Sequence, residues 1–173
     1  MIIDVFRDNV IPLLNQKFED KVNFVWGDSS YIREYLSLLK KSSSTAPYRF
    51  PLIGLYSPID EIKDSGQYEA RATVRIIIAV NTLPEYTNEQ RLDISFKKVL
   101  RPLYECLFKA IEQSRCFDVP YSGFTYTYTE NYTFGKRGAI DIDGKEIDEK
   151  IDAIEIKNLE LTIKKLNCHA KRL

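Results

Sequence analysis

The sequence predicts an α+β fold: a single domain, residues 1–173, with a mostly antiparallel (mixed) β-sheet and helices packed on one face. Apolar residues recur at helical spacing over 2–18 and 88–114. Residues 68–81 and 124–134 instead alternate with period two and are rich in β-branched and aromatic side chains. The elements follow the order α-α-β-β-α-β-β, so strand pairs flank one long helix, which is typical of this class.

The first two elements are expected to be helices. Pro12 lies inside the apolar pattern of 2–18 and should kink or divide that helix, because it removes an amide donor. The second helix should begin at GDSS, with Asp28 or Ser29 as its N-cap, and end in the polar loop KKSSSTAP. Its buried face is predicted to consist of Ile32, Leu36 and Leu39.

Two strands are expected next. The segment RFPLIGLYSPI (49–59) is apolar and bracketed by prolines, which predicts an edge strand or an interrupted one. The strand 68–81 has one face that is apolar throughout, and its other face begins polar and becomes apolar at Ile77 and Ala79. This strand should therefore start with one face accessible and finish buried on both.

The second half of the chain contains the long helix and the final strand pair. Pro102 should bend the helix 88–114 near residues 98–101. In 124–134 the aromatic residues occupy even positions, while threonine and asparagine occupy odd ones. In the last strand, DAIEIKNLELTIKKL, the apolar positions change from even to odd, so we expect a β-bulge near Lys157–Asn158.

Composition narrows the class of protein. Lys and Arg number 25, as do Asp and Glu, so the basic excess typical of nucleic-acid binders is missing. No apolar run approaches the ~20 residues of a membrane-spanning helix, and the charged N-terminus MIIDVFRDNV does not match a signal peptide. Cys106, Cys116 and Cys168 lack CxxC spacing, which favours reduced thiols in a cytoplasmic protein.

The most suggestive stretch for chemistry is TFGKRGAIDIDGKEIDEKID, residues 133–152. Counted from Asp141 as a calcium loop, Gly144 comes two places early and Lys145 takes a ligand position, so no metal site is expected. FGKRG ends a strand and does not join a strand to a helix, so it does not match a phosphate loop. Residues 135–151 are therefore predicted to be a charged hairpin extension, which contacts an assembly partner if it has a function.

Catalytic groups are not predicted. The only histidine, His169, lies beside Cys168 in a tail (167–173) expected to be frayed. No nucleophile–base pair follows from spacing, so the sequence predicts no enzyme, no catalytic residue and no cofactor.

Two surfaces have alternative interpretations. The aromatic face of 124–134 predicts core packing under the helices, and its alternative is a platform for a small ligand or single-stranded nucleic acid. That strand alternates with threonine and contains Glu130, where stacking platforms have Lys and Arg. The polar row Glu69, Arg71, Thr73, Arg75 could face solvent or form a polar subunit interface.

The organisation resembles the phage tail terminator family, the neck-region group that includes tail-completion proteins. The resemblance covers most of the chain, and the segments that carry it are IIDVFRDNVIPLLNQ, FPLIGLYSP, EARATVRIIIAVNTLPEYTNEQRLDISFKKVLRPLYECLFKAI and DAIEIKNLELTI. It implies a structural virion protein without chemistry that forms a ring, usually a hexamer. Such a ring stops growth of the tail tube and joins it to the head–tail connector, with nucleic acid at most passing through the lumen.

From this resemblance follow expectations for location and contacts. The protein would reside in the virion tail or neck, and in the bacterial host cytoplasm before assembly. Glu69, Arg71 and Arg75 are expected at the subunit interface, and Lys136 and Arg137 at a partner contact. The helix near 29–40 and the connection 135–151 are larger than a minimal member would need.

Overall fold

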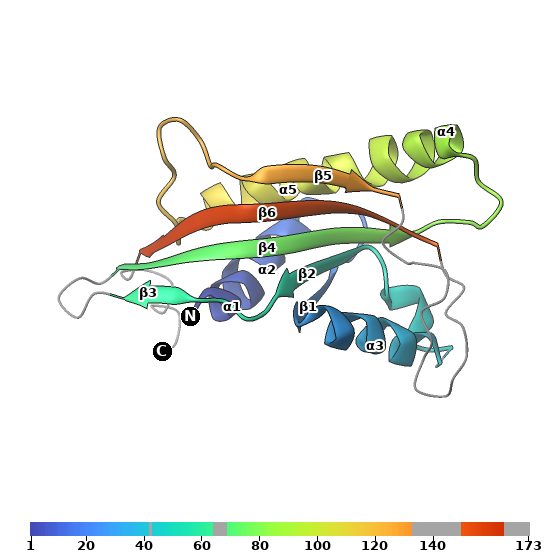
Figure 1. Ribbon diagram of the computed structural model, residues 1–173, viewed down its shortest axis with the longest axis horizontal. Helices are drawn as coiled ribbons and strands as arrows, with labels where there is room; N and C mark the ends of the chain where they lie inside the picture. Colours follow the sequence, from blue (N-terminus) through green and yellow to red (C-terminus); the bar gives the residue numbers. More distant parts are fainter. Residues whose placement is uncertain (42, 64–68, 133–149, 165–173) are drawn as a thin grey trace.

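A mixed β-sheet forms the centre of the protein, which confirms the predicted α+β class (Figure 1). The computed structural model describes residues 1–41, 43–63, 69–132 and 150–164. The sheet is six-stranded, in the order β1-β2-β4-β6-β5, and β3 also pairs with β4. Among the strand pairs of the described residues, only β1–β2 is parallel. The strands are β1 (Asn23–Gly27), β2 (Leu52–Tyr56), β3 (Glu61–Lys63), β4 (Glu69–Asn81), β5 (Thr127–Asn131) and β6 (Ile151–Lys164).

Both long helices predicted from the sequence are present, and each contains a π-helical stretch, η1 or η3, immediately before its proline segment. Pro12 and Pro102 lie just after the π-helical stretches, where each continuous helix passes into α2 or α5, and neither residue can donate an amide hydrogen bond. The expected disturbance at each proline therefore takes the form of a widened helix upstream of it. The helical elements are α1 (Ile2–Val5), η1 (Phe6–Val10), α2 (Ile11–Asn15), α3 (Ser29–Lys40), the short 3₁₀ turn η2 (Ala46–Tyr48), α4 (Asn88–Arg91), η3 (Leu92–Leu100) and α5 (Arg101–Gln113).

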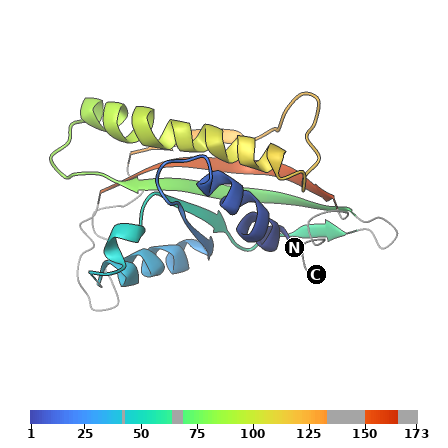
Figure 2. The ribbon, with the colours of Figure 1, turned by 180° about the vertical axis from the view of Figure 1, so that it is seen from behind.

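The two long helices cover the same face of the sheet, as predicted. Figure 2 shows α1–α2 and α5 in front of the strands. On β4, Val74, Ile76 and Ile78 belong to the main apolar core with these helices. Helix α3 is the exception to the one-face prediction, because it packs on the opposite face, against Ile77 and Ala79.

Helix α3 begins where the sequence predicts. Asp28 is its N-cap, and the Asp28 Oδ1 accepts the amides of Ser30 and Tyr31 at 2.8 and 2.9 Å. Gly54 lets the helix approach the sheet closely, since a Cβ there would lie 2.6 Å from Ile77 Cγ2 and 3.3 Å from Ile32 Cδ1. Ile32 and Leu36 are buried as expected, whereas Leu39 is only partly buried.

For 49–59 the sequence predicted an edge strand or an interrupted one. The edge position is wrong, whereas the interruption is confirmed, because β2 and β3 both pair with β4 and residues 57–60, with Pro58, separate them. Strand β2 lies between β1 and β4, and all five of its residues are buried. Pro51 and Pro58 flank the strand and remove no donor from its interior, and the Pro51 carbonyl still accepts the Asn23 amide at 2.9 Å.

The sequence pattern did not reveal β1 and β3. Strand β1 is the five-residue run NFVWG, and β3 has three residues, so neither is long enough to show period-two alternation. Strand β1 forms one outer edge of the main sheet, the position that the sequence assigned to 49–59.

The predicted bulge in the last strand is confirmed. Val74 pairs with Leu159 and Ile76 pairs with Ile156, so Lys157 and Asn158 together lie opposite Arg75. Asn158 has a φ of 56°, a left-handed conformation that asparagine tolerates better than most residues.

A buried ion pair joins the start of the long helix to the start of β6. Arg91 Nε donates to Asp152 Oδ1 at 2.9 Å, and Nη2 contacts the same oxygen and the Tyr132 carbonyl. Arg91 is 6% exposed and Asp152 is fully buried. The guanidinium also lies over the Tyr132 ring, 5.2 Å from its centroid. One arginine therefore ties together the helix, β6 and the end of β5.

The expectation of three reduced thiols is wrong at Cys116, which is disulfide-bonded with a partner outside the described residues. Spacing along the chain could not show this, because the fold brings Cys116 to the end of β6, where its carbonyl accepts the Lys164 amide at 2.8 Å. Cys106 is a free thiol.

Candidate functional site

The uncovered part of the sheet, which we call the open sheet face, is the face opposite the long helices where α3 does not reach. In Figure 1 this face of β4 and β6 lies in front of α5 and the N-terminal helix. It begins where the odd-numbered residues of β4 change from apolar to polar, as the sequence predicted. Its exposed side chains are Ile62, Arg71, Thr73, Arg75, Asn158, Glu160 and Lys164.

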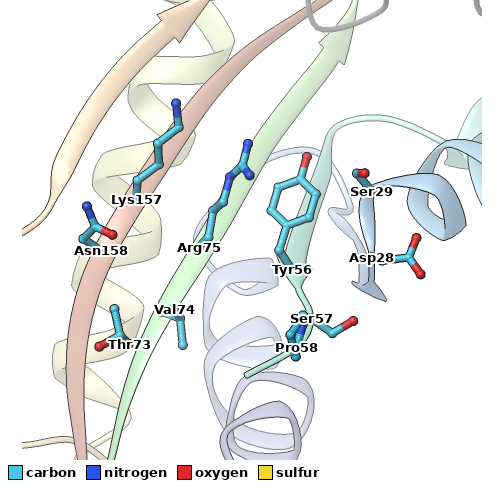
Figure 3. Close-up of a pocket in the computed structure, with 10 residues that line it drawn as sticks. All are labelled: Asp28, Ser29, Tyr56, Ser57, Pro58, Thr73, Val74, Arg75, Lys157 and Asn158. Atoms are coloured by element: carbon cyan, nitrogen blue, oxygen red, sulfur yellow. The ribbon is translucent and has the colours of Figure 1, made fainter. Parts of the chain in front are cut away.

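A hollow of about 510 Å³ lies in the open sheet face beside the bulge (Figure 3). Strands β2, β4 and β6 and the start of α3 line it. Its volume falls in the range of ligand pockets, roughly 300–1,000 Å³. Seven of its residues can donate hydrogen bonds from their side chains: Ser29, Tyr56, Ser57, Thr73, Arg75, Lys157 and Asn158.

One buried carboxylate organises the floor of the hollow. Glu155 Oε2 accepts Arg75 Nη2 at 2.9 Å and lies 3.2 Å from Lys157 Nζ. The other oxygen, Oε1, accepts Asn131 Nδ2 at 2.7 Å. The guanidinium of Arg75 also lies over the ring of Tyr56, 4.5 Å from its centroid. Figure 3 shows Arg75 and Lys157 on neighbouring strands, with the Tyr56 ring beside the guanidinium.

Glu155 is held as the charged form. Burial raises its pKa, but hydrogen bonds from Asn131, Arg75 and Lys157 together outweigh burial, so its pKa lies below the ordinary value. A carboxylate with a lowered folded-state pKa stabilises the fold above its unfolded pKa, and this contribution is lost as the pH falls through the folded value.

We therefore expect the free energy of unfolding to fall as the pH drops below roughly 4. Glu61 and Glu130 also have lowered pKa values and contribute in the same direction. Glu155→Gln should flatten the acid limb of a stability–pH curve measured by urea unfolding. Glu160→Gln, on the same strand but exposed, is the matched control and should leave the curve unchanged. Equal curves for wild type and Glu155→Gln would show that the cluster does not hold Glu155 charged.

Tyr56 supplies a hydroxyl to the hollow from a largely buried side chain. The residue is 8% exposed, and its hydroxyl has no hydrogen-bond partner among the residues that the structure describes. Burial raises its pKa, and the nearby charges of Arg75 and Arg33 only partly oppose this, so the phenol stays protonated and can donate.

The predicted interface residues occupy different surroundings. Arg71 is exposed, opposite Ile62 on β3 and Thr162 on β6. Arg75 is half exposed but already bound to Glu155. The backbone of Glu69 pairs with Lys164, and its side chain lies outside what the structure describes. Lys136, Arg137, His169 and residues 141–149 of the calcium-loop candidate also lie outside the described residues, whereas the twelfth residue of that candidate, Asp152, is the buried partner of Arg91.

Sequence reasoning missed Glu155, Lys157 and Tyr56 as partners of Arg75. A signal for the first two was present: if Ile154 and Ile156 face the core, Glu155 and Lys157 face the other side with Arg75. No local signal places Tyr56 there, because the pairing of β2 with β4 is a tertiary contact.

In the described part of the aromatic row of 124–134, Phe124, Tyr126 and Tyr132 pack under the helices, whereas Tyr128 is 39% exposed and contacts Tyr104 edge-on. Tyr126 stacks on Phe108 with ring centroids 4.8 Å apart, and Phe96 lies 4.4 Å from Tyr132. Phe124 also packs against the main core. Helix side chains therefore occupy ring faces that base stacking would need.

Two searches of the described residues bear on other classes of site. Within 1–41, 43–63, 69–132 and 150–164, no three His, Cys, Asp or Glu side chains are grouped as they would be around a metal ion. In the same ranges, no helix combines the length and apolar character that crossing a membrane requires.

Comparisons with known proteins add no relative to this description. A scan of protein-family models finds no match to the chain, and a search of curated proteins finds none either.

Proposed function

We propose that this protein is a structural assembly protein of the phage tail terminator type, which forms a ring through the open sheet face and performs no chemistry. The support from sequence is the order of its elements, which resembles that family. The support from geometry is a polar sheet face that no helix of the described residues covers and that presents opposite charges without partners among those residues.

Arg71 and Glu160 are the observation that carries the proposal. They lie on adjacent strands, since Arg71 pairs with Thr162 and Thr73 pairs with Glu160. Both side chains are exposed, and neither has an ion-pair partner in the described part of the chain. Ile62, opposite Arg71, is 69% exposed, so an apolar side chain lies beside these charges. Arginine next to exposed apolar surface is typical of protein–protein interfaces.

In a closed ring, one patch of each subunit contacts a different patch of its neighbour. The open sheet face supplies one such patch, and Arg71 is the charged residue of this patch that contributes most to the contact with the neighbour. Arg75 would contribute mainly by holding the surface in shape, because Glu155 already binds it. The tail tube protein and the head–tail connector are the proposed partners of the assembled ring.

Sedimentation velocity over a concentration series tests this proposal. Wild type should sediment as a closed oligomer, with six-fold rings in negative-stain electron microscopy. Arg71→Glu should weaken association by about 100-fold, because like charges would meet at the seam. Lys109→Glu makes the same charge change on the exposed side of α5, in the opposite layer, and should sediment like wild type. A wild type that stays monomeric throughout, or an equal effect of both variants, would contradict the proposal.

A further inference from the structure

Two cations line the hollow beside the bulge, and only one carboxylate pairs with them among the described residues. Arg75 and Lys157 share one carboxylate, Glu155, whose side chain is 7% exposed. The Arg75 and Lys157 side chains are 50% and 38% exposed, so both cations remain accessible from the hollow. Asp28 does not neutralise the surplus directly: its Oδ1 is used by two helix amides, and its carboxylate is turned away from Arg75 (Figure 3).

These cations are held in place before any ligand arrives. The Arg75 guanidinium is fixed between the Tyr56 ring and Glu155, and Asn131 fixes Glu155 in turn. The bond to Glu155 uses one of the five guanidinium N–H groups, which leaves others to donate. Binding of a ligand here therefore costs little conformational entropy, because the arginine side chain is already ordered.

The Tyr56 hydroxyl is an independent sign of a ligand. It belongs to a side chain that is more than nine-tenths buried, lacks a partner among the described residues, and lines the hollow beside the guanidinium (Figure 3). The hydroxyl oxygen is not among the fully buried, unsatisfied atoms of the described residues, so it opens onto the hollow and can donate to a ligand there. A guanidinium, an ammonium and a phenol that converge on one space form a donor set for an oxyanion.

We propose that this hollow is an oxyanion site that binds one carboxylate or phosphate group through Arg75, Lys157 and Tyr56. Thr73 also lines the hollow, further along β4 from the three head groups (Figure 3). The volume exceeds that of the anionic group alone, so the ligand has a body attached to it. The site is built within one chain and does not depend on the proposed ring.

Isothermal titration calorimetry in low-salt buffer, with inorganic phosphate and with succinate as probes, tests the site. Wild type should bind at least one of them saturably, with one site per chain. Tyr56→Phe removes only the hydroxyl and keeps the ring under Arg75, and it should weaken binding about tenfold. Lys157→Met should weaken it at least as much, while Glu155 keeps Arg75 and Asn131.

Arg71→Ala is the matched control, because it removes a cation from the same face of the same strand outside the hollow. It should leave the affinity within about twofold of wild type. No saturable binding to wild type, or equal losses in Arg71→Ala and Lys157→Met, would overturn the proposal. Thermal unfolding by circular dichroism checks that each variant is folded.

Sedimentation of the same variants identifies the natural source of the anion. If a neighbouring chain inserts a carboxylate, phosphate and succinate will compete with assembly, and Lys157→Met will weaken it. If the ligand is a free anion, Lys157→Met will assemble like wild type while Arg71→Glu still fails. A loss of anion binding with intact assembly therefore separates this site from the proposed ring.

Discussion

Replacing Arg91 with methionine is expected to lower the free energy of unfolding by about 3–5 kcal/mol. Asp152 is fully buried, and its Oδ2 has no hydrogen-bond partner among the described residues. The charge of Asp152 is therefore compensated through Oδ1, by Arg91. Without the arginine, an uncompensated carboxylate would remain in the core, which costs far more than loss of an exposed ion pair. Urea unfolding followed by tyrosine and tryptophan fluorescence measures the effect.

The double variant Arg91→Met, Asp152→Leu distinguishes the free energy lost with the ion pair from the cost of leaving the Asp152 carboxylate buried and unpaired. Replacing both partners with apolar side chains of similar volume is often nearly neutral, so this variant should regain most of the stability. If Arg91→Met alone costs less than about 1 kcal/mol, water must reach Asp152 and the pair is not truly buried.

Adding a side chain at Gly54 is expected to have the second largest effect. Gly54→Ala should cost roughly 1–3 kcal/mol, and Gly54→Val more, because the new atoms enter a well-packed interface. The Cβ would lie 2.6 Å from Ile77 Cγ2 on the paired strand β4 and 3.3 Å from Ile32 Cδ1 on α3, so the Ile77 side chain would have to shift and the contact with α3 would be crowded. The same urea titration measures this loss, and a fall in helical circular dichroism would report the displacement of α3.

Ile77→Leu offers a rescue of Gly54→Ala, because leucine has no methyl group on Cβ. The pair should show a favourable coupling energy in a double-mutant cycle. Additive effects of the two changes would mean that the strain at Gly54 does not come from this methyl group.

Features encoded by neighbouring residues were predictable from the sequence. The N-cap at Asp28 follows from GDSS, and the bulge at Lys157–Asn158 follows from a change of parity within one strand. The two long helices, which carry wide apolar stripes, were also found. Each of these features depends on a pattern within one segment, so contacts with distant segments are not needed to predict it.

The errors concern contacts between distant segments. Strand β2 was expected at an edge because its prolines are visible in the sequence, whereas the short β1 that covers it is not. The placement of α3 on the second face depends on Gly54, whose role appears only once β2 lies beside Ile77. Among the residues that line the hollow, Arg75 was predicted as a site residue from the sequence. Its partners on β2 and β6 were missed because only the folded sheet brings these strands together.

The bulge changes the surface of the sheet, whereas the packing of the interior does not require it. If Asn158 were deleted, the last strand would read IEIKLELTIK, with unbroken alternation and the same apolar residues toward the helices. The core therefore has no use for the extra residue, and a chain one residue shorter would fold around the same interior. What the additional position changes is the local course of β6 opposite Arg75, where the hollow lies.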